Sequence, residues 1–152
     1  MTHEYFMKEA LKEAQKALPY GDIPIGTVIV QEGTIIARAH NQVERLKDPT
    51  AHSEMLAITQ AADQMKHERL LKTVLYTTLE PCAMCAGAIV LSRIPVLCFA
   101  TADPKAGACG SIFNIVRDDR LNHRASIITG ILEQESRFLI QEFFKKLRKE
   151  KR

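Results

Sequence analysis

A Cys-x-x-Cys pair that begins directly after a proline limits how this chain can fold. Residues 81–85 read Pro-Cys-Ala-Met-Cys and follow an apolar, β-branched run, so we expect Cys82 and Cys85 at the start of a helix. Residues three apart share one face of a helical turn, and the dipole at this end of a helix favours thiolate over thiol. The pair indicates either a metal site or a redox pair.

A third metal-binding side chain lies upstream, in His52-Ser53-Glu54. Two thiolates and one imidazole hold a zinc ion with its fourth position open to water, which is the arrangement of a catalytic site. The sequence has no obvious fourth ligand, because His40, His67 and His123 lie outside any paired metal spacing.

Glu54 makes the metal site a candidate for catalysis. Zinc lowers the pKa of a bound water to about 7. A carboxylate beside the metal can then carry the released proton to a leaving group. Residues two apart in a helix point about 200° away from each other. His52 and Glu54 can therefore converge only at a first helical turn, which predicts a site where two helix N-termini meet.

The periodicity of apolar residues predicts alternating helices and strands. Helices on both faces of one mixed sheet follow from this order, as a three-layer α/β domain whose later strands are parallel. The expected elements are a helix from a Thr2 cap to Leu18, ended by Pro19 and Gly21; a hairpin of 27–30 and 35–39 around Glu32-Gly33; a helix over 51–65; a strand at 74–78; a helix from Pro81 or Cys82 to about 92; a strand at 96–100; a loop over 101–114; a short strand at 124–128; and a long helix over 132–147.

Length and composition are those of one globular domain covering residues 1–152. Apolar residues make up 46% and charged residues 26%, as is usual for such domains. No stretch approaches the roughly 20 apolar residues that cross a bilayer, which argues against a membrane protein. The first residues lack the apolar middle segment of a signal peptide, so we expect a cytoplasmic protein.

Positive charge is concentrated at the C-terminal end. Residues 145–152 carry six basic side chains and one acidic one, whereas the rest of the chain is slightly acidic. Such an end suits a phosphate backbone. It is equally the solvated end of a helix, where lysine and arginine complement the helix dipole, and the sequence leaves both readings open.

The combined pattern H-x-E…P-C-x-x-C is the signature of zinc nucleobase deaminases. Over nearly its whole length the chain also resembles the bacterial tRNA adenosine deaminases, which make inosine at the wobble position of the anticodon. The cysteine segment is shared across the cytidine-deaminase-like superfamily, and residues 103–111 and 122–124 resemble the tRNA branch. The matching segments are 22–26, 48–54, 79–88, 103–111, 122–124 and 143–144.

This resemblance implies a fold, a cofactor and an assembly. The fold is a five-stranded mixed sheet between helices, and the assembly is a homodimer. His52, Cys82 and Cys85 would hold one Zn²⁺ per chain, and Glu54 would shuttle protons. The implied reaction is hydrolytic deamination of adenosine in the anticodon arm of tRNA.

The resemblance also implies substrate contacts. Asn41 would hydrogen-bond the target base, while Asp103 and Lys105 would lie in an RNA-contacting loop. Phe143 and Phe144 would lie near flipped nucleotides, where an aromatic face can stack on a base. Simpler readings exist: Asn41 as a turn residue, Lys105 as a surface lysine, and at least one of the two phenylalanines in the core.

Some positions depart from the family pattern. Ser53 stands where the family usually has alanine, and Ala106 and Cys109 replace a usual threonine and alanine. None of these removes a catalytic group, so they bear on RNA fit. Cys98 lies in an apolar strand and is expected to pack in the core, and Cys109 is given no role.

Two other functions use the same features. A deaminase of a free base or nucleotide, of the guanine or cytosine type, would have the same metal motif. A non-catalytic zinc-containing RNA-binding module would have the same basic end. The 103–111 segment and the basic end favour RNA over a free base, and Glu54 favours an enzyme over a binding module.

Overall fold

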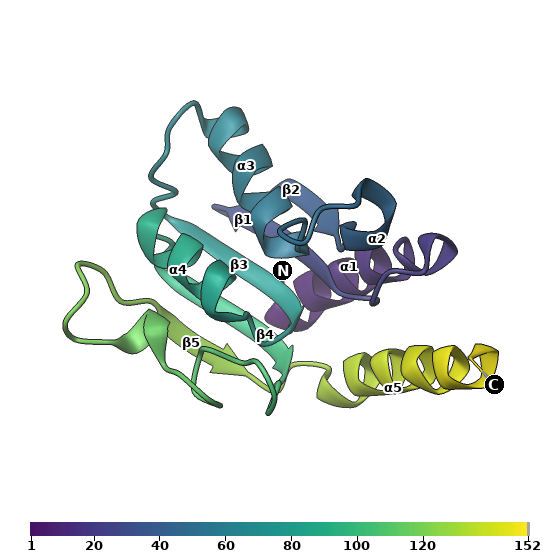
Figure 1. The fold of residues 1–152 in the computed structure, drawn as a ribbon. Coiled ribbons are helices and arrows are strands. Elements are labelled where there is room, and N and C mark those ends of the chain that lie inside the picture. Colours follow the sequence, from purple (N-terminus) through teal and green to yellow (C-terminus); the bar gives the residue numbers. More distant parts are fainter. Residues whose placement is uncertain (152) are drawn as a thin grey trace.

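The computed structural model describes residues 1–151 and contains a five-stranded sheet in the order β2-β1-β3-β4-β5 (Figure 1). β1 pairs antiparallel with β2 and β3, whereas β3–β4 and β4–β5 are parallel, so the predicted mixed sheet is confirmed. No helix within the described residues has the length and apolar character needed to cross a membrane. The elements are α1 (His3–Gln15), η1 (Leu18–Tyr20), β1 (Gly26–Gln31), β2 (Thr34–His40), α2 (Val43–Leu46), α3 (Ser53–Met65), β3 (Thr73–Leu79), α4 (Ala83–Leu91), β4 (Val96–Thr101), η2 (Ile115–Arg117), β5 (Ser126–Thr129) and α5 (Glu133–Glu150).

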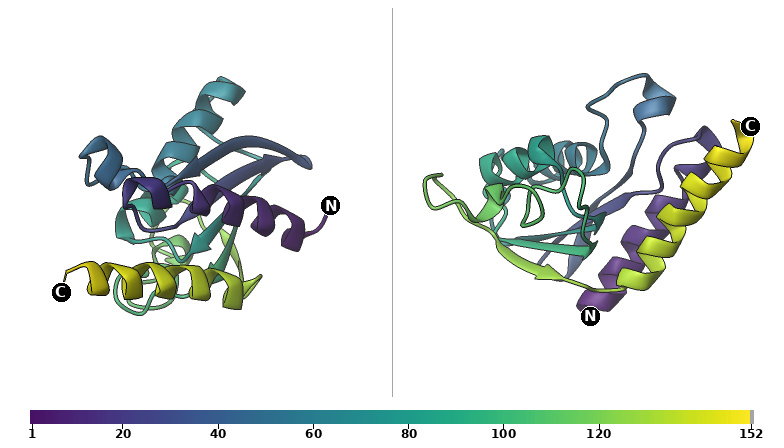
Figure 2. Two further views of the ribbon diagram at one scale, coloured as in Figure 1. Left: turned by 90° about the vertical axis from the view of Figure 1, so that its right-hand side faces the viewer. Right: turned by 60° about the horizontal axis from the view of Figure 1, so that its bottom comes forward.

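Helices cover both faces of this sheet, as the sequence predicts. Figure 2 shows α3 and α4 on one face and α1 and α5 on the other. Neighbouring strand residues serve opposite faces: Ile29 and Leu75 belong to the cluster packed under α3 and α4, and Val28 and Tyr76 to the cluster under α1. This alternation follows from the two-residue repeat of a strand.

The predicted hairpin is present, with Glu32 and Gly33 as its two-residue turn. Their φ angles are 48° and 83°, both in the left-handed region. A tight hairpin turn that matches the strand twist requires such values, which glycine adopts readily. Thr2 also caps α1 as predicted, since its side chain accepts a hydrogen bond from the Tyr5 backbone N–H.

Several predicted boundaries are wrong. The fourth helix begins at Ala83 because Cys82 has extended backbone angles and is its N-cap, so Pro81 lies outside the helix. The last strand begins at Ser126 rather than at 124. The first helix, predicted to reach Leu18, ends at Gln15, and Leu18 is 40% exposed.

α5 contributes little to the core. Within this helix only Ser136 is buried, where its hydroxyl donates to the Thr78 carbonyl. Phe143 is half-buried and Phe144 is 38% exposed, so the expectation that one of them packs in the core is wrong. The helix extends past the sheet, which leaves its apolar side chains partly uncovered (Figure 1). Arg152, the last residue of the predicted basic end, lies outside the described residues.

The contact between α1 and the sheet generates a prediction about Gly26. A Cβ atom at this position would collide with the Ala10 carbonyl and the Ala14 backbone nitrogen, which cannot rotate away. Because overpacking against backbone forces the helix off the sheet, Gly26→Ala should lower the free energy of unfolding by about 3 kcal/mol in urea denaturation.

Gly87→Ala is the matched control. No atom lies within 4 Å of a Cβ added there, and the position is inside α4. Alanine should stabilise this helix by about 0.5–1 kcal/mol. Equal stability of the two variants would contradict the close helix–sheet packing.

Candidate metal centre and active site

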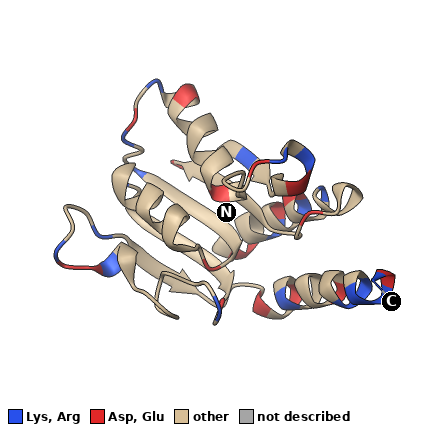
Figure 3. Ribbon diagram, viewed as in Figure 1, with Lys and Arg blue, Asp and Glu red and all other residues tan. Residues whose placement is uncertain are grey.

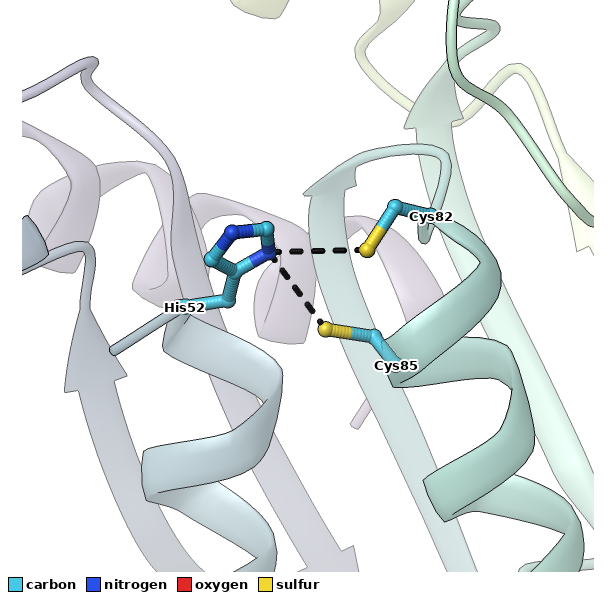
Figure 4. Close-up of side chains that lie close together, drawn as sticks. All are labelled: His52, Cys82 and Cys85. Carbon is cyan, nitrogen blue, oxygen red and sulfur yellow. Dashed lines mark hydrogen bonds between the residues drawn. The ribbon is translucent and has the colours of Figure 1, made fainter. Parts of the chain in front are cut away.

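Three potential metal ligands converge at the N-termini of α3 and α4. His52 is the N-cap residue of α3, Cys82 is the N-cap residue of α4, and Cys85 lies in the first turn of α4. His52 Nδ1 lies 3.6 Å from the Sγ atoms of both Cys82 and Cys85 (Figure 4). The predicted meeting of two helix N-termini is therefore observed.

These separations fit a zinc ion. Tetrahedral zinc, at about 2.3 Å from sulfur and about 2.0–2.1 Å from nitrogen, places its nitrogen and sulfur ligands about 3.6 Å apart. The three donor atoms all lie within 4.8 Å of one another, and they form the only such His/Cys/Asp/Glu group within residues 1–151. One imidazole and two sulfurs leave a fourth tetrahedral position open.

The electrostatics of the three ligands call for a cation. Hydrogen bonds from Cys85 and His52 lower the pKa of Cys82 to about 3, so Cys82 is a thiolate. The bond to Cys82, together with burial, raises the pKa of Cys85, and the bond to Cys82 also raises the pKa of His52. A second buried thiolate beside the first is costly without a positive charge. A divalent ion removes this cost and allows both sulfurs to bind as thiolates.

Glu54 lies in the first turn of α3 and is only 4% exposed. Burial raises the pKa of its carboxyl group. The Ser53 hydroxyl donates to Glu54 Oε1 at 2.8 Å, and the same hydroxyl lies 2.8 Å from Thr27 Oγ1 in β1. The carboxyl group is therefore held in one orientation and is easier to protonate than an exposed glutamate, which suits proton transfer.

Asn41 follows β2 and is almost fully buried. Its amide oxygen accepts a hydrogen bond from the Ser53 backbone N–H at 2.9 Å, so it secures the first turn of α3. The amide NH₂ has no hydrogen-bond partner within the described part of the chain. Asn41 also lines the adjoining cavity, so its amide lies beside the space that a substrate would occupy.

A cavity of about 460 Å³ brings most of the predicted site residues together. This size is typical of small-molecule sites. Cys85 is fully buried beneath it, and Lys105 lies outside it, in a neighbouring cavity that shares Asp103 and Phe144. The predicted residues that line the 460 Å³ cavity are Asn41, His52, Glu54, Cys82, Asp103, Phe143 and Phe144.

Glu80, which was not among the predicted site residues, also lines this cavity. Glu80 is only 3% exposed, and burial raises the pKa of its carboxyl group. Hydrogen bonds from Ser111 and from backbone N–H groups lower the pKa by more than burial raises it, so the pKa is below its usual value. Its place directly before Pro81 is the only sequence signal, because a buried glutamate looks like an exposed one in a sequence. Asp103 accepts hydrogen bonds from the backbone of Lys105 and Ala106, so it also shapes its own loop.

The remaining cysteines lie apart from the metal ligands. Cys98 is fully buried in the core cluster under α1, as expected of a packing residue. Cys109 is also buried, and its Sγ lies 3.9 Å from the Pro81 carbonyl. All four cysteines are free, so none forms a disulfide.

Comparison with known proteins identifies the family. Residues 1–101 match the family model of the cytidine and deoxycytidylate deaminase zinc-binding region. The tRNA-specific adenosine deaminase of Aquifex aeolicus is 51% identical over 148 residues, which cover 97% of each chain. That of Bacillus subtilis is 48% identical over 149 residues, which cover 98% of this chain and 92% of the relative.

Solved structures agree with these relatives. One from a study of A-to-I editing by tRNA:A34 deaminases at the wobble position superimposes with a TM-score of 0.85 at 40% identity, covering 89% of this chain and 98% of that chain. Guanine deaminase from Bacillus subtilis has a TM-score of 0.64 at 41% identity, covering 67% and 66%. Both the metal-site geometry and these similarities show that the chain belongs to the zinc-dependent cytidine and deoxycytidylate deaminase family and, within it, to the tRNA-specific adenosine deaminases.

Proposed function

We propose that this protein converts adenosine to inosine at the wobble position of a tRNA anticodon. It does so as one deaminase domain, residues 1–152, with one zinc ion per chain, in the cytoplasm. The observation that carries the proposal is the position of Glu54 in the same cavity as the zinc ligands His52 and Cys82. The relatives named tRNA-specific adenosine deaminases supply the substrate class, because they match the chain over nearly its full length.

Binding of the base follows from the shape of the cavity. A base that is stacked in RNA cannot enter the cavity that His52, Glu54 and Cys82 line, so the wobble adenosine must flip out of the stack. The free NH₂ of Asn41 then donates to an acceptor nitrogen of the purine. Phe143 and Phe144 line the cavity with their rings edge to face, and the ring centroids lie 5.3 Å apart. They offer surfaces on which neighbouring bases stack.

The chemistry requires two proton transfers, which we assign to Glu54. When bound, the zinc ion supplies Lewis-acid activation of a water molecule for attack on C6 of adenine. Glu54 takes one proton from the attacking water and delivers it to N1 of the ring. It then carries the second water proton to the amino group at C6, which leaves as ammonia. The oxygen stays on C6, so adenosine and water become inosine and ammonia.

The rest of the RNA is bound outside the cavity. Lys105 is exposed on the loop after β4, and we assign its ammonium group to a contact with phosphate. Lysine and arginine also cluster at the C-terminal end of α5 (Figure 3). We assign this basic end, residues 145–152, to the phosphate backbone of the anticodon arm.

A test of the proton transfers compares two variants at the site. Glu54→Gln should keep zinc but lose at least about 100-fold in turnover, because the amide cannot carry a proton. Cys85→Ala should lose both zinc and activity, because one ligand is gone. Zinc content by atomic absorption and single-turnover inosine formation check both expectations.

Cys98→Ala is the control: this cysteine lies in the core under α1, so zinc should stay bound. A fully active Glu54→Gln enzyme would exclude Glu54 as the proton carrier.

A second test concerns the substrate. Purified protein should form inosine in an anticodon stem-loop with adenosine at the wobble position, read as guanosine after reverse transcription. It should release little ammonia from free guanine, cytosine or adenine, because the two phenylalanines and the basic end contact only a polynucleotide. Faster ammonia release from guanine than from the stem-loop would instead favour the free-base function, to which the guanine deaminase similarity points. Inactivity on every substrate would favour a silent RNA-binding module.

We also propose that the protein is a homodimer, as the family resemblance implies. Large apolar side chains on the loop before η2 and at the end of α4 support this: Phe113 is 57% exposed and Leu91 79% exposed. Sedimentation velocity at micromolar concentration should give about twice the chain mass of 17.1 kDa. A single species at the chain mass would refute the dimer.

A further inference from the structure

The carboxylate of Glu80 holds together a loop that is distant in the sequence. Glu80 Oε1 accepts from the Asp103 backbone N–H at 3.0 Å and from the Ser111 hydroxyl. Glu80 Oε2 accepts from the backbone N–H groups of Cys109 and Ser111, at 2.9 and 3.1 Å. Both oxygens of one buried carboxylate are thus fully used by residues 103–111.

The loop is built to enclose this carboxylate. A Cβ atom at Gly107 would collide with the carboxylate of Glu80, so only glycine allows the loop to pass so closely. Within residues 1–151, no lysine, arginine or histidine forms an ion pair with Glu80. Its negative charge is balanced by N–H and O–H dipoles of the loop alone, and these bonds are stronger than those between neutral groups.

The outer side of the same loop forms a wall of the active site. Residues 107–109 are buried against Glu80, while Pro104, Lys105 and Ala106 are exposed. Asp103 and Ala106 line the cavity that also contains His52 and Glu54, and Pro104 and Lys105 line the neighbouring cavity of about 530 Å³. Residues 107–109, which enclose Glu80, and residues 103–106, which line the two cavities and form the loop tip, are therefore parts of one short segment.

We propose that Glu80 is a positioning residue for RNA binding: its buried carboxylate anchors residues 103–111, so that the loop tip is preorganised as a wall of the active site. This role rests on the proposed action on tRNA. Because both carboxylate oxygens of Glu80 are occupied by the loop, we assign it no part in the chemical step. Its effect is on the affinity for RNA, because a loop that must be ordered during binding weakens binding.

Glu80→Gln tests the anchor with almost no change of shape. The amide NH₂ would face N–H donors on one side of the loop, so at least one of the hydrogen bonds to the backbone must break. The matched control is Glu68→Gln, the same substitution at an exposed side chain in the segment after α3. Ser111→Ala is a milder second variant that removes only the hydroxyl bond, for use if Glu80→Gln fails to fold.

Limited trypsin digestion measures how well residues 103–111 are held in place, and it does not depend on enzyme activity. Lys105 is an exposed cleavage site on the loop tip. Glu80→Gln should accelerate cleavage after Lys105 at least about tenfold, because the loop opens locally, while cleavage within the C-terminal end of α5 stays at the wild-type rate. Mass spectrometry identifies the cut. An unchanged rate after Lys105 would overturn the anchor.

Substrate binding is measured by steady-state kinetics on the anticodon stem-loop. Glu80→Gln should raise KM about tenfold and change kcat less than about threefold, with zinc content unchanged; Glu68→Gln should match the wild type. A fall in kcat with an unchanged KM would overturn the positioning role, even where the loop is released. If the wild-type protein forms no inosine, the proposed function fails while the digestion still decides whether Glu80 anchors the loop.

Discussion

Neutralising the paired sulfurs of Cys82 and Cys85 is the requirement on which the rest of this structure depends. Cys82 and Cys85 stand at a helix N-terminus beside the imidazole of His52, and both can be thiolates only with a divalent cation among them. The ligands come from two helices that are separate in the sequence. The fold must therefore hold α3 and α4 side by side at one end of the sheet, and their first turns become the floor of the active site.

Ser53, Asn41 and Glu80, which are buried beside this floor, each make a specific hydrogen bond. The Ser53 hydroxyl bonds to Glu54, and the Ser53 backbone N–H bonds to the amide oxygen of Asn41. The Glu80 carboxylate accepts hydrogen bonds from the loop after β4. A buried polar group without a partner is costly, so these bonds fix the orientations of Glu54, Asn41 and Glu80 in the cavity. Preorganisation of the site is thus a consequence of burial.

Much of this arrangement follows from local patterns. The P-C-x-x-C and H-x-E spacings determine which atoms can bind zinc, and the 3.6-residue period of a helix requires His52 and Glu54 to meet at a first turn. Boundaries were less predictable: Pro81 suits a first helical position, yet Cys82 is the cap. The phenylalanines of α5 have the spacing of a core stripe, but the helix extends past the sheet and leaves Phe144 38% exposed.

The sequence by itself indicated His52, Cys82 and Cys85 as candidate metal ligands with Glu54 beside them, and it determined the layered order of helices and strands. Each of these depends on the spacing of nearby residues. Only the tertiary structure decided that Glu80 is buried and bonded to residues 103–111, that Asn41 turns its oxygen toward α3, and that Phe143 and Phe144 border the cavity. These facts depend on contacts between segments far apart in the chain. No local pattern records which distant backbone N–H a carboxylate or an amide will meet.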